Sequence, residues 1–175
     1  DKLFADLYAA ELAGGSSAYK EIDALAESCP PGANKLFFVP TLAGASSLDK
    51  SVNAKGGYFG LDLMHSREDI ARATLEGIAL NLRVALDILR KYVCIGDGML
   101  LVGGGSKSLL WRQIFADVYG MNIAAAKVGE DAGSFGAAAV AAVGAGLWQN
   151  FDTIKSLVKD ENMTPPDLKQ REFYN

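Results

Sequence analysis

The sequence predicts an α/β fold, and observations in its second half carry that prediction. Met99 to Val102 is a short apolar run typical of a buried strand, and the residues after it predict an amphipathic helix. Met121 to Ala126 predicts a second strand, and Ala132 to Gly146 a second helix. Strands that alternate with helices are typical of layered α/β domains. The 175 residues, 50% of them hydrophobic, suffice for roughly one domain with its own core.

The first half of the chain predicts mainly helices. Residues 2–13 carry apolar side chains at helical spacing, and a second short helix is expected around residues 22–26. The apolar run at 36–39 precedes a proline and predicts a buried strand. Residues 41–57 are polar and rich in glycine and serine, which predicts a long loop, and long loops in compact domains are often functional.

The strongest predicted element is a long helix that begins after Ser66 and runs to about Tyr92. Ser66 is a candidate N-cap, and Asp69 follows in the first turn, where the helix dipole favours anions. Apolar residues cover much of the circumference, which predicts a mostly buried central helix. Gly77 lies in its interior, where glycine costs roughly 1 kcal/mol relative to alanine. We therefore predict that another backbone segment packs against Gly77.

A glycine triplet, Gly103 to Gly105, lies between the predicted strand and the helix that follows it. Glycine lets backbone N–H groups approach a ligand closely, and the helix N-terminus adds free donors. Ser106 and Ser108 are candidates to cap the helix or to contact the ligand. The local pattern leaves a tight turn without a ligand equally open. The phosphate-loop motif fails because Ser106 precedes Lys107, and Ser108 replaces the last glycine of the dinucleotide-binding fingerprint.

Composition excludes several functional classes. Lys and Arg total 17 and Asp and Glu total 21, and a net charge of −4 argues against nucleic acid or an anionic membrane as the main partner. The apolar runs are too short for a membrane-spanning helix. With His65 as the single histidine, neither a histidine-based metal site nor a Ser-His-Asp triad is expected. Cys29 and Cys94 lie far apart without a metal-type spacing, which indicates either a reducing cytoplasm or simply two small buried side chains.

Two further interpretations concern aromatic and small residues in the helices. Tyr92, Trp111 and Phe115 occupy helical positions and are interpreted as core residues rather than as a ligand cage. Gly133 and Gly136 lie in a helix made of small residues, and they would allow very close backbone packing there.

Taken in order, these segments resemble the C-terminal half of a sugar kinase of the FGGY family, closest to its xylulokinase members. Gly56 to Leu61 followed by Asp69 to Glu76 fits the family's second signature at each constrained position. Gly103 to Ser108, with Trp111-Arg112-Gln113 after it, is similar to the xylulokinase form of the adenine-nucleotide motif. Gly133 to Ala138 is similar to the small-residue helix that closes the domain.

The resemblance implies an actin-like, ribonuclease-H-like ATPase domain over residues 1–160, followed by an extended tail over 161–175. Family members have two such domains, with the sugar held on the N-terminal domain and ATP on the C-terminal one. An aspartate takes the proton from a sugar hydroxyl, which attacks the γ-phosphate of ATP with the help of Mg²⁺. The implied activity is phosphorylation of a sugar, first of all D-xylulose, in the cytoplasm.

The resemblance also assigns site residues. It places Gly103, Gly104, Gly105, Ser106 and Ser108 at the adenosine end of ATP or ADP. Ser108 stands where many relatives carry asparagine, so a contact from its side chain to the base or ribose is expected.

The chain departs from the family in what it lacks. No segment matches the first phosphate loop, the sugar-binding domain or the segment with the catalytic aspartate, so the chain is interpreted as an incomplete part of a kinase without catalytic or metal-binding residues of its own. Ala45-Ser46-Ser47 replaces residues that are usually charged. Alternatives are a kinase of gluconate, ribulose, L-xylulose or erythritol, a non-catalytic regulatory domain, and a dinucleotide-binding domain. Family members are commonly dimers, so a homodimer is one expected state.

We expect the isolated chain not to phosphorylate any sugar, because no residue in it corresponds to the family's proton-accepting aspartate. The measurement is ADP release with D-xylulose and ATP, with a full-length family member as the positive control. ATP-dependent phosphorylation of D-xylulose by the purified 175-residue chain would contradict the expectation.

Overall fold

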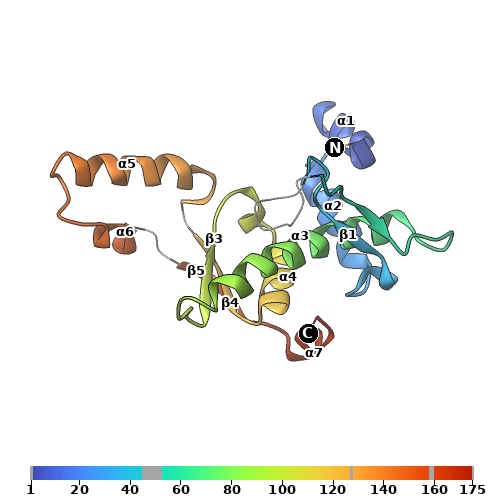
Figure 1. The fold of residues 1–175 in the computed structure, drawn as a ribbon. Helices are drawn as coiled ribbons and strands as arrows, with labels where there is room; N and C mark the ends of the chain where they lie inside the picture. The colour runs from blue at the N-terminus through green and yellow to red at the C-terminus, as the bar shows by residue number, and fades with distance from the viewer. Residues whose placement is uncertain (1, 45–52, 127, 158–159, 175) are drawn as a thin grey trace. The chain divides into compact units, whose positions relative to one another are not determined.

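A computed structural model describes residues 2–44, 53–126, 128–157 and 160–174 of the chain (Figure 1). The chain divides into two compact units. Unit 1 comprises Asp1–Ile95 together with Glu172–Asn175, and unit 2 comprises Gly96–Arg171. Residues 1–160, expected as one domain, are thus shared between the two units.

Unit 1 is built around the long helix α3, Arg67–Leu89. Helix α2, Ala18–Ser28, and strand β1, Phe37–Val39, both contact α3. Helix α1, Ala5–Leu12, follows a 3₁₀ turn at Lys2–Phe4 and contacts α2. The predicted helices and the strand are therefore confirmed, although α3 ends before Tyr92. The strand is buried only at Phe38, since Phe37 and Val39 are exposed.

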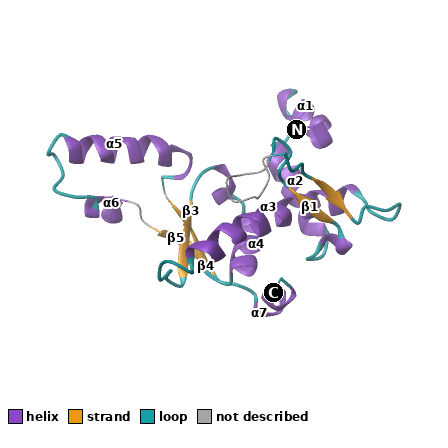
Figure 2. Ribbon diagram, in the orientation of Figure 1, coloured by secondary structure: helices purple, strands orange, loops and turns teal. Residues whose placement is uncertain are grey.

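A two-stranded antiparallel sheet covers part of α3. Strand β2, Gly57–Phe59, pairs with β1 (Figure 2). In the register of this pair, Phe38 lies opposite Tyr58. Phe38 is buried, and its ring lies 4.7 Å from the Tyr58 ring between centroids. Phe38 belongs to a hydrophobic core cluster of unit 1, whose buried members are Cys29, Ala33, Leu36, Phe38 and Ala73. Residues 45–52 of the loop predicted at 41–57, including Ala45-Ser46-Ser47, lie outside the described residues.

Unit 2 contains a strand–helix–strand arrangement. Strand β3, Gly98–Leu101, leads through a 3₁₀ turn into helix α4, Leu109–Tyr119. Strand β4, Asn122–Ala126, then pairs parallel to β3. Strand β5, Asp160–Thr164, pairs antiparallel with the other edge of β4, which gives the strand order β3-β4-β5. The predicted α/β class and both predicted strands of this half are confirmed, but β3 is not buried, since its side chains are half-buried or exposed.

The remaining helices follow β4. Helix α5 spans Ala132–Gly144, and helix α6 spans Asp152–Leu157. Residues 161–175, expected as an extended tail, contain the end of β5 and helix α7, Leu168–Phe173. Helix α7 carries the chain from unit 2 back into unit 1. Among the described residues, no helix is both long and apolar enough to cross a membrane.

Two interpretations of single residues are corrected. Phe115 is buried, as predicted, but Tyr92 is 80% exposed because α3 ends at Leu89 and leaves Tyr92 in the turn that follows. The close packing that Gly133 and Gly136 would allow is not found among the described residues, since a Cβ at either would meet nothing within 4 Å. These glycines therefore leave α5 with an open surface.

Candidate functional site

The glycine loop leaves the carboxyl end of β3 and forms its own tight turn. Gly103 has a φ of +84°, a conformation that favours glycine. The Ser106 hydroxyl donates to the Gly103 carbonyl oxygen at 2.7 Å, and the Ser106 amide donates to the same oxygen at 3.1 Å. Ser106 is 3% exposed, so its side chain holds the turn from inside the unit.

Ser108 caps helix α4. Its Oγ accepts a hydrogen bond from the Trp111 backbone N–H at 3.1 Å. The capping role that the sequence left open is thereby confirmed. A hydroxyl has one proton to donate besides the lone pairs that accept, so the same group is still able to donate to a ligand.

The fold gives no packing reason for glycine at position 105. A Cβ there would meet only ring carbons of Trp111, at 3.9 and 4.0 Å, which is an ordinary contact distance. The φ of Gly105 is not in the left-handed region, and both Gly104 and Gly105 are exposed. The backbone of the loop is therefore accessible from solvent on the side where glycine lacks a side chain.

A second loop meets the glycine loop at the same edge of the sheet. The Gly103 N–H donates to the Gly129 carbonyl oxygen at 3.0 Å, and Gly129 opens the 3₁₀ turn Gly129–Asp131 between β4 and α5. Ligands of α/β sheets bind at the carboxyl ends of the strands, where these two loops lie. Gly129 was not among the predicted site residues, although a glycine three residues after the second predicted strand was a signal for it.

The motif residues that follow the glycine loop act within unit 2. Asp117 is 1% exposed, and its Oδ1 accepts from the Gln113 side chain at 2.8 Å and from the Asp167 backbone N–H at 2.7 Å. Gln113 also donates to the Pro165 carbonyl oxygen at 3.2 Å. These contacts hold the segment after β5 against α4, so this part of the motif stabilises the unit.

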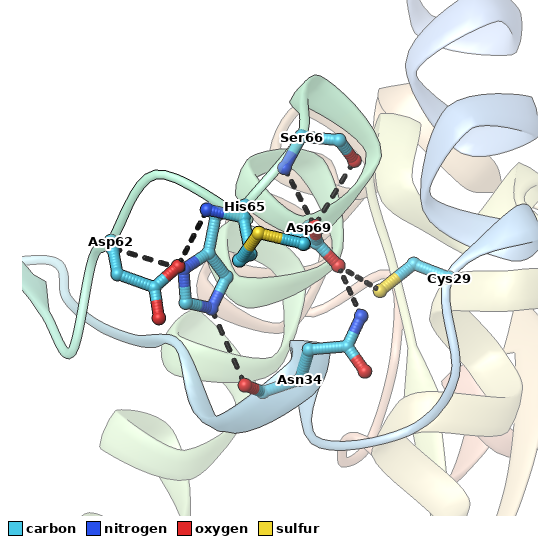
Figure 3. A network of polar contacts seen from close by, with 7 residues as sticks. Cys29, Asn34, Asp62, His65, Ser66 and Asp69 are labelled. Carbon is cyan, nitrogen blue, oxygen red and sulfur yellow. Dashed lines mark hydrogen bonds and ion pairs between the residues drawn. The ribbon is translucent and has the colours of Figure 1, made fainter.

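The second signature lies entirely in unit 1, where Asp69 organises the start of α3 (Figure 3). The Asp69 carboxylate accepts from the Ser66 N–H at 2.7 Å and from the Ser66 hydroxyl at 3.0 Å. It also accepts from Asn34 Nδ2 at 2.8 Å and from Cys29 Sγ at 3.1 Å. The predicted N-cap at Ser66 is confirmed, and Asp69 connects it to two residues that precede β1.

The hydrogen-bond donors around Asp69 determine which groups of this cluster are charged. Burial alone would raise the pKa of Asp69, but the hydrogen bonds from Ser66, Cys29 and Asn34 outweigh it and lower that pKa to about 2. Burial, together with the neighbouring Asp69 carboxylate, raises the pKa of the Cys29 thiol to about 12. Cys29 is therefore a protonated donor and not a reactive thiolate.

His65 extends the cluster toward the loop that precedes α3. Its Nδ1 lies 3.0 Å from the Asp62 backbone nitrogen and 2.9 Å from Asp62 Oδ1. Its Nε2 lies 3.3 Å from the Asn34 carbonyl oxygen (Figure 3). Asn34 has a φ of +52°, and these contacts on its side chain and its carbonyl hold that uncommon conformation in place.

A buried ion pair lies one turn further along α3. Arg72 Nε donates to Glu76 Oε1, and both side chains are about 95% buried, with exposures of 5% and 6%. Both carboxylate oxygens of Glu76 accept from the Gly32 N–H at 3.1 Å. The Tyr174 hydroxyl donates to Glu76 at 2.6 Å and accepts from Arg72 at 3.3 Å. The pair is thus hydrogen-bonded both to the backbone at Gly32 and to Tyr174, at the end of the described chain.

Two glycines of the signature, Gly56 and Gly60, are explained by packing and backbone conformation. A Cβ at Gly56 would overlap the Val39 carbonyl oxygen, and Gly60 has a φ of +86°. The Tyr58 and Thr74 hydroxyl oxygens lie 2.7 Å apart and join β2 to α3. In this chain the signature therefore specifies the architecture of unit 1.

We expect Asp69 to make unfolding of the chain pH-dependent. Because its pKa is lowered in the folded state, the stabilisation is present above about pH 4 and is lost as the pH falls through about 2. Its loss should cost about 2 kcal/mol of unfolding free energy. Urea unfolding at pH 5, 3 and 2 should show a smaller decrease for Asp69→Asn than for the unchanged chain, whereas Asp62→Asn, at a carboxylate 62% exposed, serves as the control. Parallel decreases for all three would contradict the prediction.

The chain belongs to the FGGY family of carbohydrate kinases. The family's C-terminal domain matches residues 3–145, which span both the signature in unit 1 and the glycine loop in unit 2. Xylulose kinase of Staphylococcus epidermidis is 31% identical over 160 residues, which are 91% of this chain and 32% of that protein. The chain thus spans about a third of the length of this curated relative.

Solved structures give the same result for the fold. Ligand-bound xylulose kinase from Lactobacillus acidophilus is 28% identical with a TM-score of 0.77, over 93% of this chain and 32% of that one. Gluconate kinase from the same organism is 29% identical with a TM-score of 0.76, over 89% and 31%. Plasmodium falciparum glycerol kinase with ADP is 26% identical with a TM-score of 0.70, over 88% and 31%. These likenesses are consistent with the ATPase fold that the resemblance implied.

Proposed function

We propose that this chain is the nucleotide-binding part of an ATP-dependent sugar kinase, and that the sugar is D-xylulose. In this proposal the chain has the actin-like, ribonuclease-H-like ATPase fold and forms one domain of a two-domain kinase. That kinase acts in the cytoplasm. One observation carries the assignment of the site: Gly105 is a glycine that neither packing nor φ requires, in an exposed loop at the carboxyl end of β3. Membership in a carbohydrate kinase family and relatives that are xylulose kinases support the reaction.

The residues present fit the adenosine end of ATP. Gly104 and Gly105 would lie against the flat purine or the ribose, where a Cβ would take up space. The Ser108 hydroxyl has a proton left to donate while it caps α4. No group of three His, Cys, Asp or Glu side chains in the described part of the chain is placed to hold a metal ion. In the proposal Mg²⁺ comes with the phosphates of ATP, as is usual for this ion in kinases.

Transfer of the γ-phosphate to a sugar hydroxyl depends on placement and on charge stabilisation. In this proposal, the role of the chain is to hold adenosine through the loop at Gly103–Ser108, so that the phosphates point to the sugar. Binding of the sugar and removal of the hydroxyl proton are assigned to the N-terminal domain of the full-length kinase. A homodimer of that kinase is part of the proposal, as it is common in the family.

Another sugar or sugar acid is the second candidate, and one observation favours it. Gluconate kinase from Lactobacillus acidophilus is as similar in fold as xylulose kinase from the same organism, with TM-scores of 0.76 and 0.77. The choice of the sugar is assigned to the other domain. A panel of D-xylulose, L-xylulose, ribulose and gluconate, tested with the full-length kinase, distinguishes the two.

Valine at position 104 or 105 tests the site. In a full-length kinase that contains this chain, we expect Gly104→Val and Gly105→Val to raise the KM for ATP by about tenfold or more, because a branched side chain would occupy the surface assigned to adenosine. The KM for the sugar should stay within about twofold.

Gly57→Val is the matched control for both variants. Gly57 lies in β2 of unit 1, and a Cβ there meets nothing within 4 Å. If the KM for ATP stayed the same in both loop variants, the loop would be a tight turn without a ligand.

A further inference from the structure

The β4–α5 loop fixes the start of the glycine loop through one backbone hydrogen bond. The Gly103 N–H donates to the Gly129 carbonyl oxygen at 3.0 Å, and the Gly103 carbonyl accepts from the amide and hydroxyl of Ser106. Both polar backbone groups of Gly103 are therefore held, one by each neighbouring segment. Beyond this fixed point, Gly104 and Gly105 extend into solvent.

The position of the Gly129 carbonyl depends on a backbone conformation that favours glycine. Gly129 has a φ of +47°, and a Cβ there would meet nothing within 4 Å. The requirement for glycine therefore comes from conformation and not from space. The turn is closed by the Asp131 N–H, which donates to the Val128 carbonyl oxygen at 2.9 Å. Alanine at position 129 would strain this turn, because its Cβ disfavours the left-handed region, and we expect the strain to shift the carbonyl that holds Gly103.

The geometry points to Gly129 as a positioning residue for the nucleotide loop. It does not touch the nucleotide in this assignment; it acts through Gly103 and sets where the backbone of Gly104 and Gly105 lies. The inference rests on the proposed function, because the loop must bind nucleotide for its position to matter. It adds the β4–α5 loop, which no sequence motif assigned, to the site.

The first test asks whether the hydrogen bond is made, and it needs no nucleotide. Gly129→Ala should speed hydrogen exchange of the Gly103 amide by about fivefold, the equivalent of one ordinary backbone hydrogen bond. Gly146→Ala is the matched control, since Gly146 has a φ of +73° and equally open space but lies beyond α5. The two variants carry similar strain, so equal exchange rates of Gly103 in both would overturn the inference.

The second test asks whether the bond matters for the nucleotide. In a full-length kinase that contains this chain, Gly129→Ala should raise the KM for ATP by about fivefold and leave the KM for the sugar unchanged, and Gly146→Ala should alter neither. If Gly105→Val raised the KM for ATP and Gly129→Ala did not, the positioning role would be overturned while the proposed function stood. If neither substitution changed it, both proposals would fall.

Discussion

Gly77→Leu is expected to destabilise unit 1 by about 3 kcal/mol, the upper part of the usual range for overpacked cores. A Cβ at Gly77 would overlap the Phe38 carbonyl oxygen and would lie 2.9 Å from both the carbonyl carbon and the Cβ of Phe38. These atoms belong to β1, which is paired with β2, so they cannot move aside as the end of a flexible side chain would. The prediction that a backbone segment packs against Gly77 is thereby confirmed.

Alanine gives a sharper form of the same test. In a helix interior, alanine is more stable than glycine by about 1 kcal/mol. Gly136→Ala in α5 should show that gain because the space around Gly136 is open, whereas Gly77→Ala should destabilise. Hydrogen–deuterium exchange read peptide by peptide is the suitable measurement, since two units need not unfold together. A Gly77→Ala chain as stable as the unchanged one would contradict the packing argument.

Glu76→Gln is expected to cost about 3–5 kcal/mol, because it leaves the Arg72 guanidinium buried without its counter-charge. The control is Asp87→Asn on the same helix. Arg83 and Asp87 have the same four-residue spacing, but their side chains are 23% and 48% exposed, so loss of that pair should cost less than about 1 kcal/mol. If urea unfolding showed equal losses of unfolding free energy for Glu76→Gln and Asp87→Asn, the prediction that the buried pair contributes more would be contradicted.

A double variant distinguishes the contribution of the Arg72–Glu76 ion pair from the cost of leaving one buried charge unpaired. Arg72→Met combined with Glu76→Leu removes both charges, and apolar replacements of a buried pair are often close to neutral. It should therefore be less destabilised than the sum of the two single variants, as a double-mutant cycle measures. The Gly32 N–H and the Tyr174 hydroxyl lose their acceptor in it, so some destabilisation should remain.

The sequence predicts those parts of the fold whose signals are local. α3 was recognisable from the cap at Ser66 and from apolar periodicity, and β3 and α4 from an apolar run followed by glycines. The contact between Tyr174 and Glu76 joins residues 98 positions apart, and no local pattern indicates it. The end of α3 was misplaced because apolar residues continue past Leu89, although the helix does not.

The candidate site divides in the same way. The glycine loop was found because glycines cluster between a strand and a helix, and the cap at Ser108 was one of its predicted roles. Gly129 was missed because its partner Gly103 lies in the loop that follows the neighbouring strand β3. Neither segment alone indicates that β3 pairs with β4. The signature at Asp69–Glu76 predicted the family correctly, but its contacts serve the fold of unit 1.

The return of the chain into unit 1 has a consequence for biosynthesis. Unit 2, Gly96–Arg171, lies inside the sequence of unit 1, so a ribosome completes it before Phe173 and Tyr174 are added. Until then Glu76 lacks its phenol donor, and Gly32 lacks the aromatic ring that packs against it. The unit that begins to form first during translation is therefore finished only after the whole of the other unit has been made.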